Sequence, residues 1–312
     1  MIQGKCVMTV SAQGISGFRE ILTTDKNQYE EILKTSDERG CEYSFANLLF
    51  WGKKRIAFSN KALVIHSQYN EKSSYFYPIG CDRINIVSAL IQHAKENGSP
   101  LRFFGLLPSE VDELKLNYPN EFEFKQDEGT FDYIYEIEAL ANLNGKKLHA
   151  KRNHIHRFCE NHPDFKSEQI NENNLADVQS FLKQWFFERE TLDPSDSYTG
   201  EKKALEIALA NLNSLELESL ILRDHDEILA LTIGSRVSDS TFDIHFEKAK
   251  SGEQGAYAVI NREFAKYLNE KYPDVKYLNR EEDMGIEGLR KAKQSYLPCR
   301  QIQKFSATLL GI

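Results

Sequence analysis

The chain has 312 residues, of which 41% are hydrophobic, so it is long enough to form two domains with cores of their own. Its formal net charge of −8 disfavours a dedicated nucleic-acid-binding protein, because such proteins gain affinity mainly by neutralising phosphates. No stretch approaches the roughly 18–20 apolar residues of a transmembrane segment, and the N-terminus lacks a signal-peptide pattern. Five scattered cysteines without CxxC pairs fit a reducing compartment. We therefore expect a cytoplasmic protein that binds no DNA and has at most peripheral membrane contact.

The first half of the chain shows two strand–helix pairs. Runs of apolar residues predict strands at 62–68 and 101–106. A loop rich in Tyr, Ser and Gly follows the first strand, and the helix after it has apolar residues at helical spacing. A second helix is expected at 109–118. The apolar face of the first helix consists of Ile86, Leu90, Ile91 and Ala94.

A basic segment lies at the middle of the chain. Residues 146–157, "KKLHAKRNHIHR", include five Lys or Arg, three His and no acidic residue. One basic patch on an acidic protein can bind an anionic substrate. We therefore predict that Lys151, Arg152 and His154 bind an anionic substrate or the acceptor end of a tRNA. The alternative is a solvated linker helix whose charges only aid solubility.

Four residues in and after this segment have side chains that bind zinc in other proteins. They are His154, His156, Cys159 and His162. Their spacing matches no common zinc pattern, and the first two histidines would point apart on a helix. We therefore predict no metal site.

The second half reads as helix, helix, β-hairpin, strand, helix, strand, helix, strand. Consecutive antiparallel strands followed by a helix crossover predict an α+β layer with a mixed sheet, not a doubly wound Rossmann fold. Both halves share the order strand, loop, helix, strand, helix, which indicates a duplication, although such alternation is common in α/β proteins. The expected helices lie at 173–190, 202–213, 256–270 and 286–296, and the expected strands at 219–223, 228–235, 241–247 and 275–279.

The loop 251–257, "SGEQGAY", precedes one of these helices. Backbone N–H groups at a helix N-terminus lack intrahelical partners and attract phosphate. Gly252 and Gly255 would let a ligand approach the backbone closely. The alternative is a flexible turn before a helix.

The helix expected at 286–296 carries a lysine on its apolar face. Ile286, Leu289, Lys293 and Tyr296 share one face, and the two aliphatic residues mark that face as buried. A buried ammonium must pair with an anion or shift its pKa. A bound anion is the expected partner, and a snorkelling lysine at the helix end is the alternative. Asp283 precedes the helix and is also a candidate helix cap.

Three segments of the sequence resemble a known family. Residues 44–51, 145–158 and, above all, 277–298 ("YLNREEDMGIEGLRKAKQSYLP") are similar to the bacterial family named after the phosphatidylglycerol lysyltransferase C-terminal domain. The resemblance covers roughly residues 16–312. That family is similar to GNAT acyltransferases, with two GNAT-like units in tandem. It is also distantly similar to the Fem-type transferases, which move amino acids from aminoacyl-tRNA to a peptidoglycan precursor.

The resemblance implies an α+β fold of two tandem GNAT-like (acyl-CoA N-acyltransferase) domains, each a mixed sheet flanked by helices. Residues 16–145 would form a degenerate N-terminal domain, and residues 146–312 a C-terminal domain with the active cleft. The implied function is an acyl- or aminoacyltransferase that moves an acyl group from acyl-CoA or aminoacyl-tRNA to an amine or hydroxyl. The alternative is a non-catalytic GNAT-fold protein that binds a CoA-like or other small anionic ligand.

The resemblance also assigns roles to residues. The loop 251–257 takes the place of the GNAT loop around the pyrophosphate of coenzyme A, although it departs from the R/Q-x-x-G-x-G/A signature. Lys293 to Tyr296 looks like a Lys-x-x-aromatic pattern of Fem-type and lysyltransferase domains. The expected catalytic residues are Asp283, Lys293 and Tyr296. The expected cofactor-binding residues are Ser251, Gly252, Gln254, Gly255, Ala256, Tyr257 and Asn279. The expected substrate-binding residues are Lys151, Arg152, His154 and Arg280.

Overall fold

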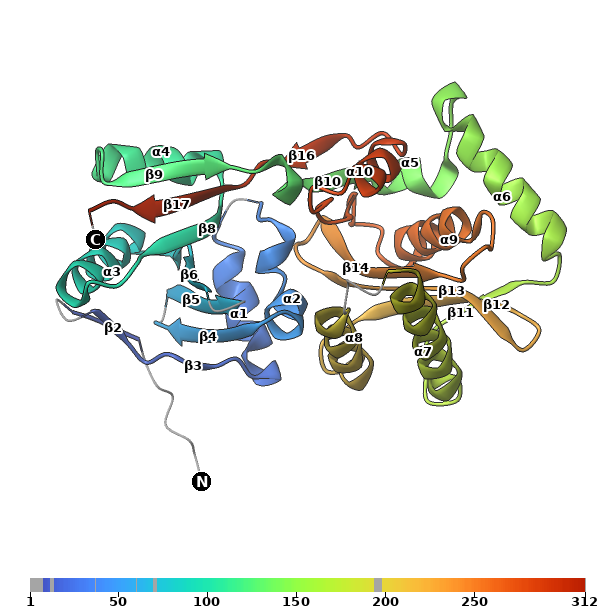
Figure 1. The fold of residues 1–312 in the computed structure, drawn as a ribbon, viewed down its shortest axis with the longest axis horizontal. Coiled ribbons are helices and arrows are strands. Elements are labelled where there is room, and N and C mark those ends of the chain that lie inside the picture. The colour runs from blue at the N-terminus through green and yellow to red at the C-terminus, as the bar shows by residue number, and fades with distance from the viewer. Residues whose placement is uncertain are drawn as a thin grey trace. The chain divides into compact units, whose positions relative to one another are not determined.

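The computed structural model of the chain describes residues 8–11, 14–36, 38–59, 61–69, 72–193 and 198–311. Packing divides the chain into two compact units, each with its own sheet. Unit 1 comprises Met1–Phe131 and Ile302–Ile312, and unit 2 comprises Asp132–Gln301 (Figure 1). Within the described ranges, no helix has the length and apolar composition needed to cross a membrane. Cys6, one of the five cysteines, lies outside the described residues.

Unit 1 contains a sheet with the strand order β3-β4-β5-β6-β8-β17-β9, and β7 pairs with β5 beside that path. The apolar face that the sequence predicts for α3 is buried in the core of this unit. The strands are β1 (Thr9–Ser11), β2 (Gly14–Ser16), β3 (Arg19–Glu20), β4 (Lys53–Phe58), β5 (Ala62–Tyr69), β6 (Lys72–Phe76), β7 (Ile79–Gly80), β8 (Arg102–Leu106), β9 (Phe122–Gln126) and β17 (Phe305–Leu309). The α-helices are α1 (Lys26–Leu33), α2 (Phe45–Phe50), α3 (Arg83–Asn97) and α4 (Pro108–Asn117), and 3-10 turns lie at Thr23–Asp25, Cys41–Tyr43 and Glu128–Thr130.

Unit 2 contains a sheet with the strand order β11-β12-β13-β14-β15-β10-β16. Helix α9 covers one face of this sheet, and α7 and α8 lie on the other (Figure 1). The strands are β10 (Asp132–Glu136), β11 (Lys166–Glu168), β12 (Glu218–Asp224), β13 (Glu227–Arg236), β14 (Thr241–Ala249), β15 (Tyr277–Asn279) and β16 (Arg300–Ile302). The helices are α5 (Ile137–Asn142), the 3-10 turn Lys146–Leu148, α6 (His149–Asn161), α7 (Leu175–Leu192), α8 (Thr199–Ala210), α9 (Ala256–Lys271) and α10 (Glu287–Gln294).

Each sheet is mixed because it combines a parallel pair with antiparallel neighbours. In unit 1, β6 pairs in parallel with β8, and in unit 2, β14 pairs in parallel with β15. A helix connects the two strands in each case, α3 in unit 1 and α9 in unit 2, as parallel neighbours require. The predicted α+β class, with two mixed sheets flanked by helices, is therefore confirmed.

Packing and sequence divide the chain at different places. Strand β10 precedes the division predicted at 145/146, but it pairs with β15 in the unit 2 sheet. Strand β17 follows that division, but it pairs with β8 and β9 in the unit 1 sheet. By packing, the chain therefore changes units at 131/132 and at 301/302. The alternation of apolar residues in a strand does not reveal which sheet the strand joins, so local patterns could not locate these exchanges.

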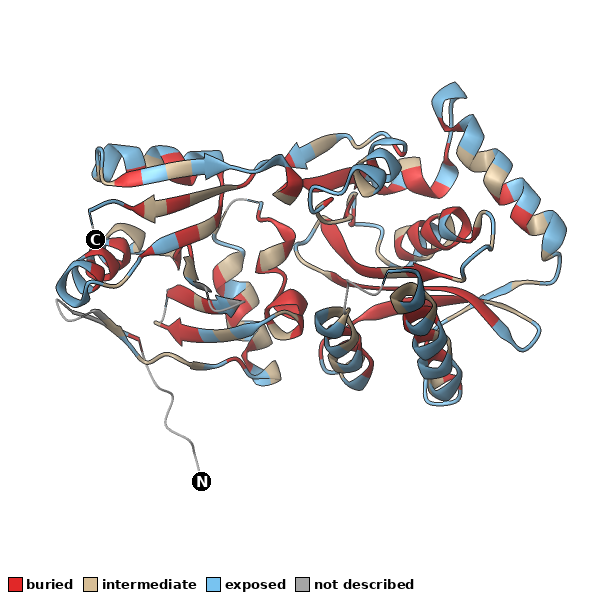
Figure 2. Cartoon of the chain, in the orientation of Figure 1, coloured by how far each residue is buried: buried red, intermediate tan, exposed pale blue. Residues whose placement is uncertain are grey.

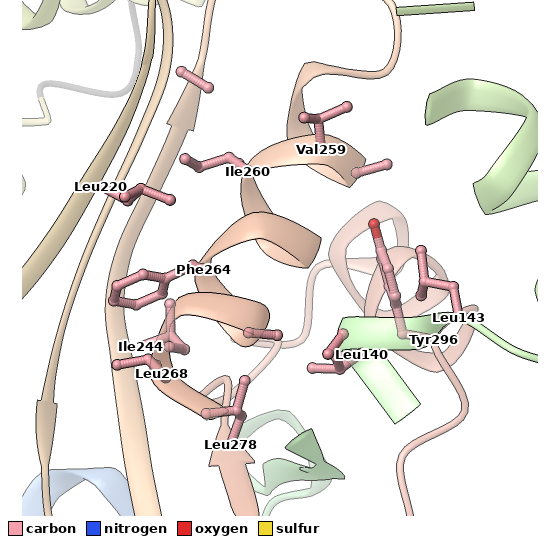
Figure 3. Close-up of a cluster of buried hydrophobic side chains, with 14 of the residues drawn as sticks. Leu140, Leu143, Leu220, Ile244, Val259, Ile260, Phe264, Leu268, Leu278 and Tyr296 are labelled. Atoms are coloured by element: carbon pink, nitrogen blue, oxygen red, sulfur yellow. The ribbon is translucent and has the colours of Figure 1, made fainter. Parts of the chain in front are cut away.

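The core of unit 2 is built where α9 packs on β14. Val259, Ile260, Phe264 and Leu268 recur at helical spacing and are all buried (Figure 3). The ring of Phe264 meets the ring of Phe242 from β14 edge-on, with centroids 6.2 Å apart. Figure 2 shows that the buried surface continues along β13 and β14. The face of β14 toward α9 is therefore an apolar surface, against which any polar group is conspicuous.

The loop before α9 is packed against α6. Gly255 has a φ of +93°, which L-residues rarely adopt, and an added Cβ would overlap the carbonyl oxygen of His154. Gly252 has a φ of +77°, but its Cβ position faces open space. Close packing of two backbones therefore requires glycine at position 255, whereas only the backbone angle favours it at 252.

His162, just after α6, ties this loop to the β12–β13 hairpin. Its Nδ1 lies 2.6 Å from Asp224, and its Nε2 lies 2.9 Å from Glu253 in the loop. A neutral imidazole has one N–H, so only the imidazolium donates to both carboxylates. Burial opposes the charged form, but the hydrogen bonds that His162 donates to both carboxylates outweigh it and raise the pKa of His162.

We predict that Gly255→Ala destabilises unit 2 more than Gly252→Ala. The Gly252 substitution forces a left-handed φ on alanine, which costs about 1–2 kcal/mol. The Gly255 substitution adds an overlap with the α6 backbone. Urea unfolding of both variants measures the difference, and equal losses would show that the loop does not pack against α6.

We also predict that His162 makes unit 2 stability pH-dependent. Because its folded pKa is raised, its contribution is complete below the unfolded pKa of about 6.5. The contribution is lost as pH rises through the folded pKa. The difference in unfolding free energy between wild type and His162→Gln should therefore shrink from pH 6 to pH 9. His156→Gln, at an exposed position of α6, is the control. A pH-independent difference for His162→Gln would contradict the paired hydrogen bonds to Asp224 and Glu253.

Candidate functional site

The parallel pair in unit 2 ends before β14 does. Strand β15 pairs with β14 only through Phe242↔Leu278 and the pairs on either side, and the last pair joins Asp243 to Asn279. Strand β14 continues to Ala249. Beyond Asn279, a side chain replaces the backbone pairing with β14: Arg280 donates a hydrogen bond to Glu247 at 2.9 Å.

A β-bulge turns Glu247 toward α9. Gly234 of β13 pairs with Ile244, and Ile233 pairs with Phe246, so His245 is an extra residue in β14. Ile244 belongs to the core under α9, and regular alternation from it would put Glu247 on the opposite face. The extra residue reverses the alternation. Glu247 accordingly accepts a hydrogen bond from Nδ2 of Asn261 on α9, at 3.2 Å.

Side chains from four elements meet around this carboxylate. We call Lys151, Glu247, Asn261, Arg280 and Tyr296 the Glu247 cluster. The guanidinium carbon of Arg280 lies 4.8 Å from the ring centroid of Tyr296, and Nζ of Lys151 lies 3.9 Å from the same centroid. The Tyr296 ring is buried among aliphatic core side chains (Figure 3). The cluster therefore joins a basic helix, a bulged strand and the end of the parallel pair.

The Glu247 cluster has an excess of positive charge and two unused polar atoms. Lys151 and Arg280 face a single carboxylate. Within the described residues, the buried Nη1 of Arg280 and the buried Oδ1 of Asn261 have no hydrogen-bond partner. Most buried polar atoms in proteins are paired, so such atoms suggest a place for a ligand. The cluster can therefore offer one donor and one acceptor to a bound group.

The same surroundings shift two pKa values. Burial raises the pKa of Tyr296 to about 12, so its hydroxyl remains a proton donor at neutral pH. Burial, followed by repulsion from Arg280, lowers the pKa of Lys151. A lysine with a lowered pKa is neutral more often at a given pH than an exposed one, and only the neutral amine can accept a proton.

Lys293 and Tyr296 are both buried, but the predicted reason for this is wrong. Ile286 is 53% exposed and Leu289 is only partly buried, so the aliphatic residues do not form the buried face. Instead, the chain after β15 folds over α10. Nζ of Lys293 donates to the carbonyl oxygens of Arg280 and Glu282, the latter at 2.7 Å. The observed hydrogen bonds thus go to backbone oxygens, where the sequence interpretation expected a bound anion.

Asp283 is fully buried, and its contacts are those of a turn-forming residue. Its carboxylate accepts hydrogen bonds from Tyr133 at 2.7 Å, from the backbone N–H of Gly285 at 2.8 Å and from Nε of Arg290 at 2.8 Å. The hydrogen bond from Arg290 lowers the pKa of Asp283 to about 2. Asp283 therefore stabilises the entry to α10, as the capping interpretation suggests, and its cationic partner is Arg290.

Of the predicted substrate-binding residues on α6, Lys151 alone reaches the Glu247 cluster in the described contacts. Arg152 donates to the carbonyl oxygens of Leu143 and Gly145 and so fixes the turn before the helix. His154 lies with its carbonyl against Gly255. These two residues hold α6 in place, while Arg280, predicted from another segment, joins Lys151.

The predicted cofactor-binding residues fall in two places. Asn279 is buried at the end of β15, where its side chain donates to Asp132 at 3.0 Å and accepts from the N–H of Glu281 at 2.7 Å. It therefore shapes the turn that delivers Arg280. The others lie in the loop before α9 and in the first turn of that helix. Ser251, Gly252, Gln254 and Tyr257 are exposed, Gly255 is partly buried and Ala256 is buried.

Two members of the Glu247 cluster were missed by sequence reasoning. Asn261 is a polar residue within the buried run of α9, next to Ile260, and that interruption is a usable signal. Glu247 was not recognisable, because its orientation depends on the bulge at His245.

A second polar group lies at the bulge. Asp243, His245 and Glu281 each offer an atom of a type that binds metals, and these atoms lie within 4.8 Å of one another. Hydrogen bonds already engage both ring nitrogens of His245, with Ser235 at 2.8 Å and with Glu281 at 3.2 Å. Ordinary hydrogen bonding accounts for this arrangement.

Several solved structures resemble this chain. A conserved protein of unknown function from Bacteroides thetaiotaomicron has 34% sequence identity and a TM-score of 0.86, with 94% of this chain and 99% of that chain covered. L-PGS from Bacillus licheniformis has 15% identity and a TM-score of 0.64, with 92% and 93% covered. FemX has 9% identity and a TM-score of 0.58, with 93% and 96% covered. The last two identities are low and show a shared fold alone.

A curated relative and a family match complete the comparison. An uncharacterized protein from Mycoplasmoides gallisepticum is 24% identical over 172 residues, so the match spans 55% of this chain and about half (54%) of that protein. Residues 33–308 match the family described as phosphatidylglycerol lysyltransferase, C-terminal. A tandem GNAT protein from the clavulanic acid biosynthesis pathway has 6% identity and a TM-score of 0.50, with 93% and 98% covered, so the predicted tandem GNAT-like fold is confirmed. Because the match covers most of its length, the chain belongs to the family of the phosphatidylglycerol lysyltransferase C-terminal domain.

Proposed function

We propose that unit 2 transfers an aminoacyl group from an aminoacyl-tRNA to an amine or hydroxyl acceptor. The family is named for a lysyl transfer, and the likeness to L-PGS and FemX supports transfer of an amino acid. The observation that carries the proposal is the Glu247 cluster, where Arg280 has a buried, unused N–H next to a lysine of lowered pKa and a protonated tyrosine.

Coenzyme A is the competing donor, and the loop before α9 is where its pyrophosphate would bind. Gly252 leaves open space there, and the N-terminus of α9 supplies N–H groups. However, Glu253 places a carboxylate in the loop, and Gly255 faces α6. The loop therefore fits a pyrophosphate poorly, which favours an aminoacyl ester. Binding of coenzyme A by residues 251–257 and Asn279 stays a prediction.

The residues of the cluster suit the steps of ester aminolysis. The acceptor nitrogen or oxygen attacks the carbonyl carbon of the ester, and its proton passes to the neutral form of Lys151. The carbonyl oxygen becomes negatively charged and takes a hydrogen bond from Nη1 of Arg280. When the bond to the ribose oxygen breaks, Tyr296 protonates that oxygen. The proton held by Lys151 then restores the tyrosine, directly or through solvent, so the cycle has no net proton change.

The direct test is transfer of label from tRNA charged with a mixture of radioactive amino acids. Acceptors would include lysine-containing peptides and vesicles of anionic phospholipid. We expect labelled acceptor with wild type and a rate about 10²-fold lower with Arg280→Lys, which keeps the charge but loses the buried N–H donor. Arg223→Lys, in an ion pair on β12, is the control and should transfer normally.

Other outcomes decide between the alternatives. Transfer of label from acyl-CoA but not from tRNA would show that acyl-CoA is the donor. Binding of an anionic ligand without turnover from either donor would favour the non-catalytic protein.

Lys293→Met tests whether this lysine positions Arg280 or reacts. Methionine would leave two buried carbonyl oxygens without their donor, so we expect a loss of about 2–3 kcal/mol in the free energy of unfolding, together with slower transfer. Denaturant unfolding and the transfer assay measure both effects. The exposed Lys291→Met, on the same helix, is the control. Unchanged stability with lost transfer would restore the direct catalytic role predicted from the sequence for Lys293.

A further inference from the structure

The two unpaired atoms of the Glu247 cluster belong to side chains that share one carboxylate. Arg280 donates through Nη2 to Oε1 of Glu247 at 2.9 Å, and Asn261 donates through Nδ2 to Oε2 at 3.2 Å. Nη1 of Arg280 and Oδ1 of Asn261 are buried and have no partner in the part of the chain that the structure describes. Glu247 therefore fixes one N–H donor and one carbonyl acceptor close together.

The carboxylate also determines which end of the Asn261 amide remains unpaired. A carboxylate only accepts hydrogen bonds, so it has to face the NH2 end of the amide, and the amide oxygen has to point away from it. Asn261 is only 3% exposed. The fold therefore buries an acceptor whose orientation is settled and which a bound N–H or O–H group can satisfy.

A third unpaired atom lies on the same face of the sheet. Thr232 of β13 pairs with Glu247 of β14, and directly paired residues project from the same face. Its Oγ1 is buried and, within the described ranges, has no hydrogen-bond partner. A hydroxyl both donates and accepts, so Thr232 does not distinguish between ligands. Three such atoms around one carboxylate nevertheless point to a bound group, because most buried polar atoms are paired.

The proposed reaction supplies a donor for Asn261 with one class of acceptor substrate. An attacking amine has two N–H bonds. One of its protons passes to Lys151, and the other stays on the nitrogen and can be donated to Oδ1 of Asn261. An attacking hydroxyl has a single proton, which Lys151 takes. Asn261 would then remain buried and unpaired during the attack, which is unfavourable.

The product of transfer to an amine fits the same two atoms. The N–H and C=O of a planar trans amide point in opposite directions, so one amide can donate to Asn261 and accept from Arg280. An ester product has a carbonyl oxygen for Arg280 but no N–H for Asn261. Both the attack and its product therefore match the cluster only when the acceptor is an amine.

We propose that unit 2 transfers its acyl group to an amine and not to a hydroxyl, and that Asn261 determines this choice. An amide C–N bond forms, the ester C–O bond breaks, and the ribose oxygen that leaves takes its proton from Tyr296. This inference rests on the proposed transfer reaction at the Glu247 cluster. It does not depend on the donor, because a thioester donor leaves the acceptor with the same number of hydrogens.

The test uses two matched acceptor peptides, one with a lysine side chain and one with a hydroxyl in place of its amine. Transfer to each is measured with wild type, with Asn261→Leu and with Asn269→Leu, a partly buried position on the same helix, as the control. Amines react faster than hydroxyls with any ester, so the informative quantity is the change that each substitution causes. For Asn261→Leu we expect about tenfold or greater loss with the amine and less than about threefold change with the hydroxyl.

A second measurement needs no variant, because Asn261→Leu also removes a donor to Glu247. The amide product and its ester isostere are compared as inhibitors of transfer by wild type, and we expect the amide to inhibit at about tenfold lower concentration. Equal loss of both activities in a folded Asn261→Leu protein, or equal inhibition by amide and ester, would overturn the inference and leave the transfer reaction intact. Absence of transfer by wild type from both aminoacyl-tRNA and acyl-CoA would remove the proposed function and this inference together.

Discussion

The early end of the β14–β15 pair is the constraint on which the site depends. Where the backbone pairing stops, the ion pair between Arg280 and Glu247 takes its place. A buried ion pair contributes little to stability compared with a well-packed apolar pair, because both charges lose their hydration. Here Lys151 and Asn261 also lie beside this ion pair, next to an apolar core where aliphatic side chains could have packed instead. This costly arrangement supports the proposal that the Glu247 cluster serves chemistry more than stability.

The position of Arg280 depends in turn on the segment after it. Glu281 and Met284 have φ values of +56° and +54°, which are uncommon for residues other than glycine. Lys293 donates to the carbonyl oxygen of Glu282 in this segment. Asp283 accepts hydrogen bonds from Tyr133 of β10, from the backbone of Gly285 and from Arg290 of α10. These residues of α10 and its entry therefore stabilise a strained backbone, and the strained backbone aims Arg280 at β14.

The sequence was a good guide wherever local periodicity decides the structure. It predicted the crossover helix α9 and the hairpin β12–β13. The burial of Lys293 does not follow from that periodicity, because Ile286 on the same predicted face is exposed. The sequence was a poor guide where pairing between strands that are far apart in the sequence decides the structure. The bulge at His245 depends on register with β13, so the orientation of Glu247 could not be deduced from alternation. The same applies to β10 and β17, because the alternation of residues in these strands does not indicate which strands they pair with.

The two units differ at the residue that follows the parallel pair, and this difference bears on where the activity lies. In unit 2 the last paired residue of β15 is Asn279, and Arg280 follows. In unit 1 the last pair of β8 joins Phe104 to Phe76, and Gly105 follows. Gly105 has no side chain to contribute.

A carboxylate from elsewhere in unit 1 occupies the space beside Gly105. An added Cβ on Gly105 would overlap the side chain of Glu42, and Glu42 is paired with Lys304 at 2.8 Å. In unit 1, therefore, the chain fills the place beside the parallel pair with its own ion pair. In unit 2, the side chain of Arg280 occupies the corresponding place and reaches Glu247 of the neighbouring strand. This difference between Gly105 and Arg280 supports the proposal that unit 2 carries the reaction and that unit 1 is a copy without a reacting site of its own.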